Sequence, residues 1–301
     1  PLKGYRNRMT PYVKGILFVL LAGICWSWLG VIVRLVEIAN TWQILFYRSI
    51  GLVPILIFYL VIKKSKTLFK LPFQYRLSNI LGAFSLVAAY LGGIYAYQET
   101  TIANAAFLFA AAPLFTAVLA WPILKEPVRK ATWLSIFLAL IGISVMVHGG
   151  LSVGALNGNI AALFSALGFA GFTISLRWDK ESEVLSMVIL AGILAILITG
   201  GILLVSNSGF VVPTNDLVLS GVVGAFTLGC GMIFYTIGSR FVAAADLALL
   251  AMIEVILAPL WGWILLAELI GVSNLVGGFL VLVSLVFNAT TGVRHKPLKV
   301  I

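Results

Sequence analysis

The segments "LGAFSL" (residues 81–86) and "VGAFTL" (residues 223–228) are nearly identical and lie 142 residues apart. Further identical pairs occur at a spacing of 142 or 143 residues: Ala103 with Ala245, Ala106 with Ala248, Leu108 with Leu250, Trp121 with Trp263, Leu124 with Leu266, Glu126 with Glu268, Gly15 with Gly158 and Arg34 with Arg177. Agreement at a nearly constant spacing across several segments predicts two copies of one structural unit. We place these copies at residues 13–149 and 157–290.

The composition indicates an integral membrane protein. Of the 301 residues, 61% are hydrophobic and only 10% are charged, with a mean hydropathy of +1.11, whereas soluble domains carry about 25% charged residues. An α-helix needs roughly 20 apolar residues to cross the hydrocarbon core, and its backbone must be hydrogen-bonded internally there. We therefore predict an all-α polytopic protein with ten transmembrane helices, near residues 13–36, 41–62, 78–98, 101–124, 131–149, 157–178, 183–205, 217–239, 243–266 and 272–290.

The basic residues predict the orientation. If the N-terminus is cytoplasmic, 18 of the 20 Lys and Arg residues fall on the cytoplasmic side, with Arg34 near the opposite face and Arg48 inside the second span. This asymmetry is the one that the positive-inside rule describes, so the termini, residues 1–12 and 291–301, should both be cytoplasmic. The net charge of +10 then reflects orientation, and we expect no nucleic acid partner. The expected location is the cytoplasmic membrane of a prokaryote.

Five spans in each copy make the repeat an inverted one. Because five is odd, the second copy enters the membrane from the side opposite to the first. Inverted repeats recur in secondary transporters, where the two halves open a central site alternately to each side.

Three segments carry a resemblance to a known family: "ILFYRSIGL" (44–52), "AYQETTIANAAFLFAAAPLFTAVLAWPILKE" (96–126) and "SRFVAAADLALLAMIEVILAPLWGWILLAE" (239–268). Their order and spacing resemble the drug/metabolite transporter superfamily, specifically its EamA-like family of ten-helix carriers, over nearly the whole chain. The resemblance implies a fold of two inverted five-helix repeats and transport of small organic solutes, commonly amino acids or related metabolites and often outward. In that family a Pro often follows the residue that matches Glu254. Here Val255 follows it and Pro259 comes later, so the helix should bend at a different level.

Glu254 and Arg48 are the main candidates for function. An ionised side chain at the bilayer centre costs roughly 2.5 to 3.5 kcal/mol on insertion scales, so Glu254, which is close to the midplane, should face the bundle interior. Arg48 lies in span two, nearer the outer side. Three hypotheses are open. The two side chains pair with each other or with helix ends; or Glu254 binds an ammonium group and Arg48 a carboxylate of a zwitterion; or Glu254 carries a proton in exchange for substrate.

Aromatic residues at midspan are candidates to line a cavity, with simple packing as the alternative role. These candidates are Trp26, its repeat partner Phe169, Tyr90 and Tyr95. Three prolines inside predicted helices, Pro54, Pro113 and Pro259, each remove a backbone donor and should kink the helix, which makes them hinge candidates.

Several function classes find no support in the residues. Cys25 and Cys230, the only cysteines, fall in apolar runs without metal-ligand spacing, so we expect no metal, no cofactor and no enzyme. No P-loop motif is present. The expected function is secondary transport of a small polar metabolite, most simply an amino acid or related zwitterion, by a monomer or homodimer, with the proton as a candidate coupling ion. A carrier of organic cations or of carboxylates is the alternative, followed by a channel.

Overall fold

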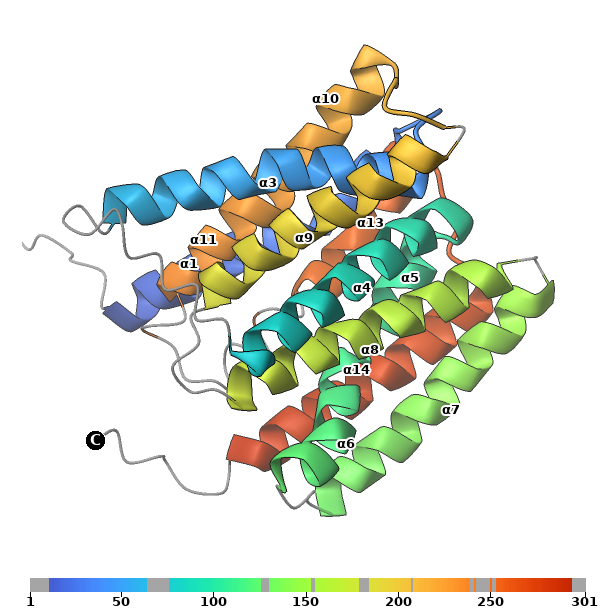
Figure 1. Ribbon diagram of the computed structural model, residues 1–301. Coiled ribbons are helices and arrows are strands. Elements are labelled where there is room, and N and C mark those ends of the chain that lie inside the picture. Colours follow the sequence, from blue (N-terminus) through green and yellow to red (C-terminus); the bar gives the residue numbers. More distant parts are fainter. Residues whose placement is uncertain are drawn as a thin grey trace, which may run out of the picture.

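The computed structural model describes residues 11–63, 76–125, 130–152, 155–178, 184–206, 208–238, 241, 250 and 253–293. Throughout this part of the chain the regular secondary structure is helical (Figure 1). The first half contains α1 (Pro11–Ser27), α2 (Leu29–Arg34), α3 (Thr41–Lys63), α4 (Leu77–Glu99), α5 (Ile102–Phe109), α6 (Ala112–Leu124) and α7 (Lys130–Ser152). The second half contains α8 (Leu156–Trp178), α9 (Val184–Val205), α10 (Thr214–Val222), the π-helix η1 (Val223–Cys230), α11 (Gly231–Gly238), α13 (Ile253–Leu266) and α14 (Val272–Val293).

These helices coincide with the predicted spans. Eight helical segments of the described chain are long and apolar enough to cross a membrane, and two shorter apolar helices, Ile253–Leu266 and Val272–Ser284, fall on predicted spans nine and ten. The first part of span nine lies mostly outside the described residues. The all-α polytopic fold predicted from composition is therefore confirmed.

Three spans are interrupted, although the sequence predicted single helices. Span one is divided at Trp28 into α1 and α2, and span eight contains η1 between α10 and α11. In span four, α5 ends at Phe109 and Pro113 lies in the first turn of α6. Proline has no N–H to bond the carbonyl four residues earlier, which is that of Phe109, so the helix ends there. Pro113 thus begins a new helix rather than kinking a continuous one.

The packing of the helices follows a pseudo-twofold pattern. Span one (α1) packs against span eight (η1 and α11), and its repeat counterpart α8 packs against α4 of span three. Likewise α3 packs against η1 while α9 packs against α4, and α1 packs against α13 while α8 packs against α5 and α6. The α3–α9 and α7–α14 interfaces each join a helix to its own counterpart in the other repeat, so the twofold operation maps each of these interfaces onto itself. Each of these interfaces is matched in the other half, as two copies related by an inverted repeat require.

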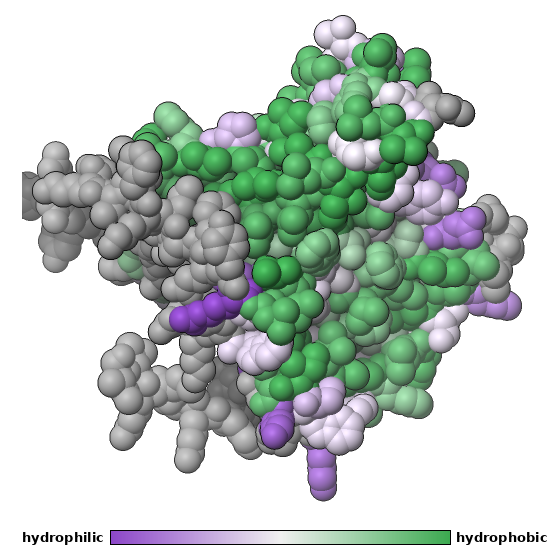
Figure 2. Space-filling model, viewed as in Figure 1, coloured by the Kyte–Doolittle hydropathy of each residue, from purple (hydrophilic) through white to green (hydrophobic). Residues whose placement is uncertain are grey.

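Apolar side chains cover most of the visible flank of the bundle, and hydrophilic residues gather toward the two ends of the helices (Figure 2). Large hydrophobic side chains that point outward include Phe58, Phe137 and Leu197, which are 66%, 64% and 65% exposed. A soluble protein rarely leaves so continuous an apolar surface in water, whereas a bilayer solvates it.

Candidate substrate-binding site

Arg48 lies on the buried face of α3. Ile44, Arg48, Leu52 and Leu56 follow one another at intervals of four residues, which places them on one side of the helix. The three aliphatic residues are fully buried, and Arg48 is only 1% exposed. The sequence therefore puts a permanently charged guanidinium where the pattern otherwise requires a large apolar side chain.

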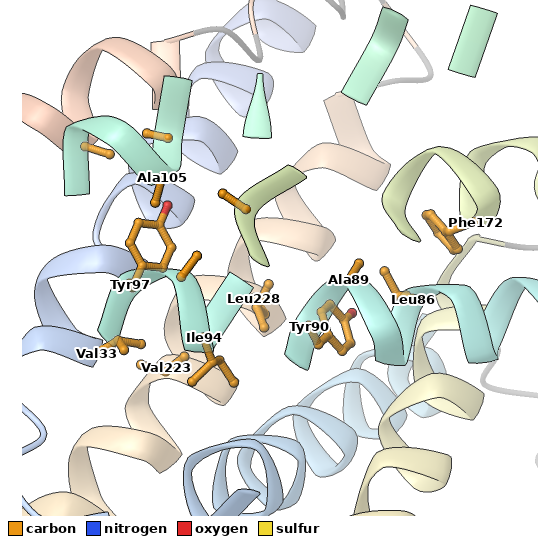
Figure 3. Close-up of a cluster of buried hydrophobic side chains, with 14 of the residues drawn as sticks. Val33, Leu86, Ala89, Tyr90, Ile94, Tyr97, Ala105, Phe172, Val223 and Leu228 are labelled. Carbon is orange, nitrogen blue, oxygen red and sulfur yellow. The ribbon is translucent and has the colours of Figure 1, made fainter. Parts of the chain in front are cut away.

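The guanidinium of Arg48 stacks on an aromatic ring of α4. Its Cζ atom lies 3.8 Å from the centroid of the Tyr90 ring, a cation–π contact of the kind that is strongest where water is excluded. Tyr90 is itself buried and belongs to the same hydrophobic cluster as Leu228 of η1 (Figure 3). Among the described residues, Nε and Nη2 of Arg48 and the hydroxyl of Tyr90 have no hydrogen-bond partner. A buried donor without a partner costs about 1–3 kcal/mol, and a charged one costs more.

The π-helix η1 brings the backbone of span eight directly against Arg48. A Cβ added to Gly224 would lie 1.8 Å from the carbonyl oxygen of Arg48, and one added to Gly51 would lie 2.4 Å from the carbonyl oxygen of Gly221. Glycine is required at Gly224, because no side chain fits between the two backbones. π-Helical turns are rare and occur frequently at functional sites.

Glu254 is carried by α13 and approaches α1. A Cβ added to Gly23 would lie 3.7 Å from the backbone nitrogen of Glu254. The side chain of Glu254 is partly exposed. Within the described part of the chain, Glu254 has no hydrogen bond and no ion pair. The carboxylate is thus left available for a solute, for water or for a proton.

Arg48 and Glu254 do not pair with each other. The ion pair within 4.0 Å that the described residues form joins Arg34 to Glu268, and no such pair joins Arg48 to Glu254. The hypothesis that these two side chains hold the bundle together by direct pairing is therefore wrong for this conformation. Arg48 lies on α3 and Glu254 on α13, at two separate positions in the bundle.

The other aromatic candidates lie in three different places. Trp26 packs against Tyr235, with ring centroids 5.5 Å apart, and Phe169 packs against Phe109 at 5.6 Å. Tyr95 is 36% exposed, on a different face of α4 from Tyr90. Among the described residues, Tyr90 is thus the member of this group that contacts a charged candidate, Arg48. Of the remaining two proline candidates, Pro54 lies inside α3, which continues through it, and Pro259 lies inside α13.

A network of charged and polar groups that the sequence did not predict lies at the predicted outer end. Arg34 Nε donates to Glu268 Oε1 at 2.8 Å, and its Nη1 and Nη2 donate to the carbonyls of Gln98 and Thr100 at 3.0 and 2.9 Å. Glu268 Oε2 accepts from the backbone N–H of Ile102 at 2.9 Å. The pair therefore ties α2, the α4–α5 turn and the end of α13 together.

An aromatic layer lies between this network and Glu254. Trp28 and Trp261 stack with centroids 5.1 Å apart, and Trp261 Nε1 donates to Ser27 Oγ at 2.9 Å. Glu254, Trp261 and Glu268 follow one another at intervals of seven residues, so the first two occupy one face of α13, two turns apart. Between the level of Glu254 and the end of α13 lie first the stacked indoles and then the ion pair.

Buried amides extend the same network into the second half. Asn104 donates to Thr100 Oγ1 at 3.0 Å, and Thr100 Oγ1 lies 3.0 Å from Asn159 Oδ1, which also accepts from Asn104. All three residues are buried. Their polar character within apolar runs is the signal by which the sequence could have identified them. Among the described residues, by contrast, no cluster of His, Cys, Asp and Glu is arranged to hold a metal ion.

A solved structure described only as "Crystal structure of protein" has a similar fold, with a TM-score of 0.65 and 16% sequence identity over 95% of this chain and 100% of that one. No curated protein matches the chain. The model of the EamA-like transporter family matches the sequence twice, over residues 13–148 and 156–290. These two matches cover both halves of the bundle and nearly all of the chain. The protein therefore belongs to the EamA-like transporter family and is a multi-pass membrane transporter.

Proposed function

We propose that this protein is a secondary carrier of a small zwitterionic metabolite, most simply an amino acid, in the cytoplasmic membrane of a prokaryote. The observation that carries the proposal is a buried cation and a separate carboxylate, Arg48 and Glu254, both without a protein partner of opposite charge among the described residues. An intramembrane ionisable residue that is not paired marks a substrate or ion pathway by default. A zwitterion supplies a counter-charge for each.

Alternating access fits the arrangement of the two halves. In the proposed cycle, the conformation described here is closed at the outer end by the Arg34–Glu268 pair and the Trp28–Trp261 stack. Because the two repeats pack as counterparts of each other, they can exchange conformations and open the site to the opposite side. Glu254 lies below both layers and serves as the ammonium site or as the proton carrier of the exchange.

Replacing Glu254 with Gln should reduce transport at least fivefold while leaving the protein folded. Glutamine retains nearly the same shape but can neither balance an ammonium group nor release a proton. The measurement is uptake and counterflow in proteoliposomes, screened with amino acids, polyamines, organic cations and carboxylates. Glu37→Gln is the matched control, since Glu37 is an exposed carboxylate at the outer end.

The same screen separates the alternatives. Transport of anions alone would contradict a zwitterionic substrate and make Arg48 the main determinant of binding. Transport of cations alone would assign substrate binding to Glu254 and not to Arg48. Flux that does not saturate and shows no counterflow would favour a channel. Equal transport by the Glu254→Gln variant would reject both functional roles of this carboxylate.

A further inference from the structure

The two unpartnered nitrogens of Arg48 belong to one edge of its guanidinium. The N–H of Nε and one N–H of Nη2 point in the same direction, and this side-on fork matches the two oxygens of a planar carboxylate. Both nitrogens are buried and lack a partner among the described residues, while the face of the group is occupied by Tyr90. The part of Arg48 that is left unpaired is thus the part that recognises a carboxylate.

No protein carboxylate of the described chain fulfils this role. Glu268 is bonded to Arg34 and Ile102, and Asp216 accepts the backbone N–H groups of Ile38 and Ala39 at 2.9 and 2.8 Å. Glu37, Glu99 and Glu254, the other carboxylates of the described chain, form no ion pair with Arg48. Ionisable side chains within a membrane pair with one another or with backbone carbonyls, or mark a substrate pathway, and this edge of Arg48 has no such pairing among the described residues.

We infer that Arg48 forms a carboxylate-binding site in which the ligand accepts two parallel hydrogen bonds from Nε and Nη2, with Tyr90 as the residue that positions the guanidinium. The ring of Tyr90 fixes the plane of the group by stacking at 3.8 Å. The close approach of η1 at Gly224 fixes the backbone that carries it. Because Arg48 is 1% exposed, a carboxylate reaches it when α3 and its neighbours move apart, and binding should favour that other conformation.

This inference rests on the proposed function for its biological meaning, but its test needs no transported substrate. Acetate is the probe, because it carries a carboxylate and nothing that Glu254 would bind, and acetamide is its uncharged counterpart. Acetate should raise the apparent melting temperature of the purified protein in a saturable manner, and acetamide should not. Equal stabilisation by the two compounds would overturn the inference.

Arg48→Lys distinguishes a fork from a simple positive charge. Lysine keeps the charge but cannot donate two parallel hydrogen bonds, so the acetate affinity should fall at least tenfold. Arg76→Lys, at the exposed N-terminal cap of α4, should bind acetate like the wild type. If Arg48→Lys binds acetate as tightly as the wild type, the inferred carboxylate site is wrong, whether or not the protein transports zwitterions. If acetate binding depends on Arg48, the site is supported, even if the protein transports no zwitterion.

Two variants of Tyr90 test its positioning role. Tyr90→Phe keeps the ring and should retain acetate binding within about twofold, while Tyr90→Leu removes the stacking surface and should weaken it as Arg48→Lys does. Rescue by the aromatic variant would support positioning through the ring. Equal loss in both variants, with both proteins folded, would overturn that role.

Discussion

Replacing Gly224 with Ala should destabilise the protein strongly, by about 3 kcal/mol or more, although alanine is the better helix former by about 1 kcal/mol. The added Cβ would lie 1.8 Å from the carbonyl oxygen of Arg48, 2.8 Å from its carbonyl carbon and 2.9 Å from the backbone nitrogen of Leu52. Backbone atoms cannot rotate away as a side chain can. Helices α3 and η1 would have to separate along their contact.

Gly221 is the matched control for this substitution, one turn earlier in the same span. A Cβ added there meets no atom within 4 Å, so Gly221→Ala should leave the melting temperature unchanged or raise it slightly. The measurement is the apparent melting temperature of the purified variants in detergent, together with their yield of monodisperse protein. Gly224→Ala with wild-type stability would show that α3 and η1 do not approach as closely as described.

The membrane spans and the internal repeat could be predicted from the sequence because each depends on an average over many residues. Each span is specified by some twenty apolar side chains, so a few exceptions do not alter the prediction. The repeat was visible for the same reason, and the family match now confirms two copies of the EamA unit. The orientation remains a prediction from the positive-inside rule, since no bilayer is present in the structure.

Local backbone geometry was not predictable in this way. The segments 81–86 and 223–228 have nearly the same sequence, yet the first lies within the regular helix α4 and the second forms most of η1. Their neighbours differ: Gly82 packs against Met187 and Ser175, whereas Gly224 packs against the backbone of Arg48. A short sequence match therefore does not predict which hydrogen-bond pattern forms.

The candidate site was predicted in part. The cost of burying charge made Arg48 and Glu254 the main candidates, and the structure buries Arg48 and leaves Glu254 partly exposed, but this cost does not specify the partner of a buried ion. The structure separates the two and places Arg48 on Tyr90. The pairing of Arg34 with Glu268 was within reach, because the charge bias and the repeat already placed both residues at the outer end.

Removing the Arg34–Glu268 pair should open the outer end of the bundle. The two side chains are 29% and 17% exposed, so the pair lies between surface bridges, worth up to about 1 kcal/mol, and buried ones, whose disruption costs about 3–5 kcal/mol. A loss of about 2 kcal/mol corresponds to a roughly thirtyfold increase in the population that is open on that side. Arg34→Ala and Glu268→Gln should both have this effect.

A single cysteine at Ser27 reports this opening. Ser27 is fully buried and accepts a hydrogen bond from Trp261 in the aromatic layer beneath the ion pair, and the change to cysteine is nearly isosteric. In a background in which Cys25 and Cys230 are replaced by Ala, a membrane-impermeant thiol reagent added from the outer side should label Ser27→Cys slowly. It should label it roughly thirtyfold faster when Arg34→Ala or Glu268→Gln is also present.

Glu37→Gln controls for a change of charge at the same end of the molecule, because the Glu37 side chain is exposed and, among the described residues, Glu37 bonds Asp216 through its backbone N–H. This variant should label at the rate of the parent. If labelling of Ser27→Cys is as slow without the Arg34–Glu268 pair as with it, the pair does not close the outer end, and the stacked indoles alone must do so. Faster labelling only from the cytoplasmic side would show that the orientation assigned from the basic residues is reversed.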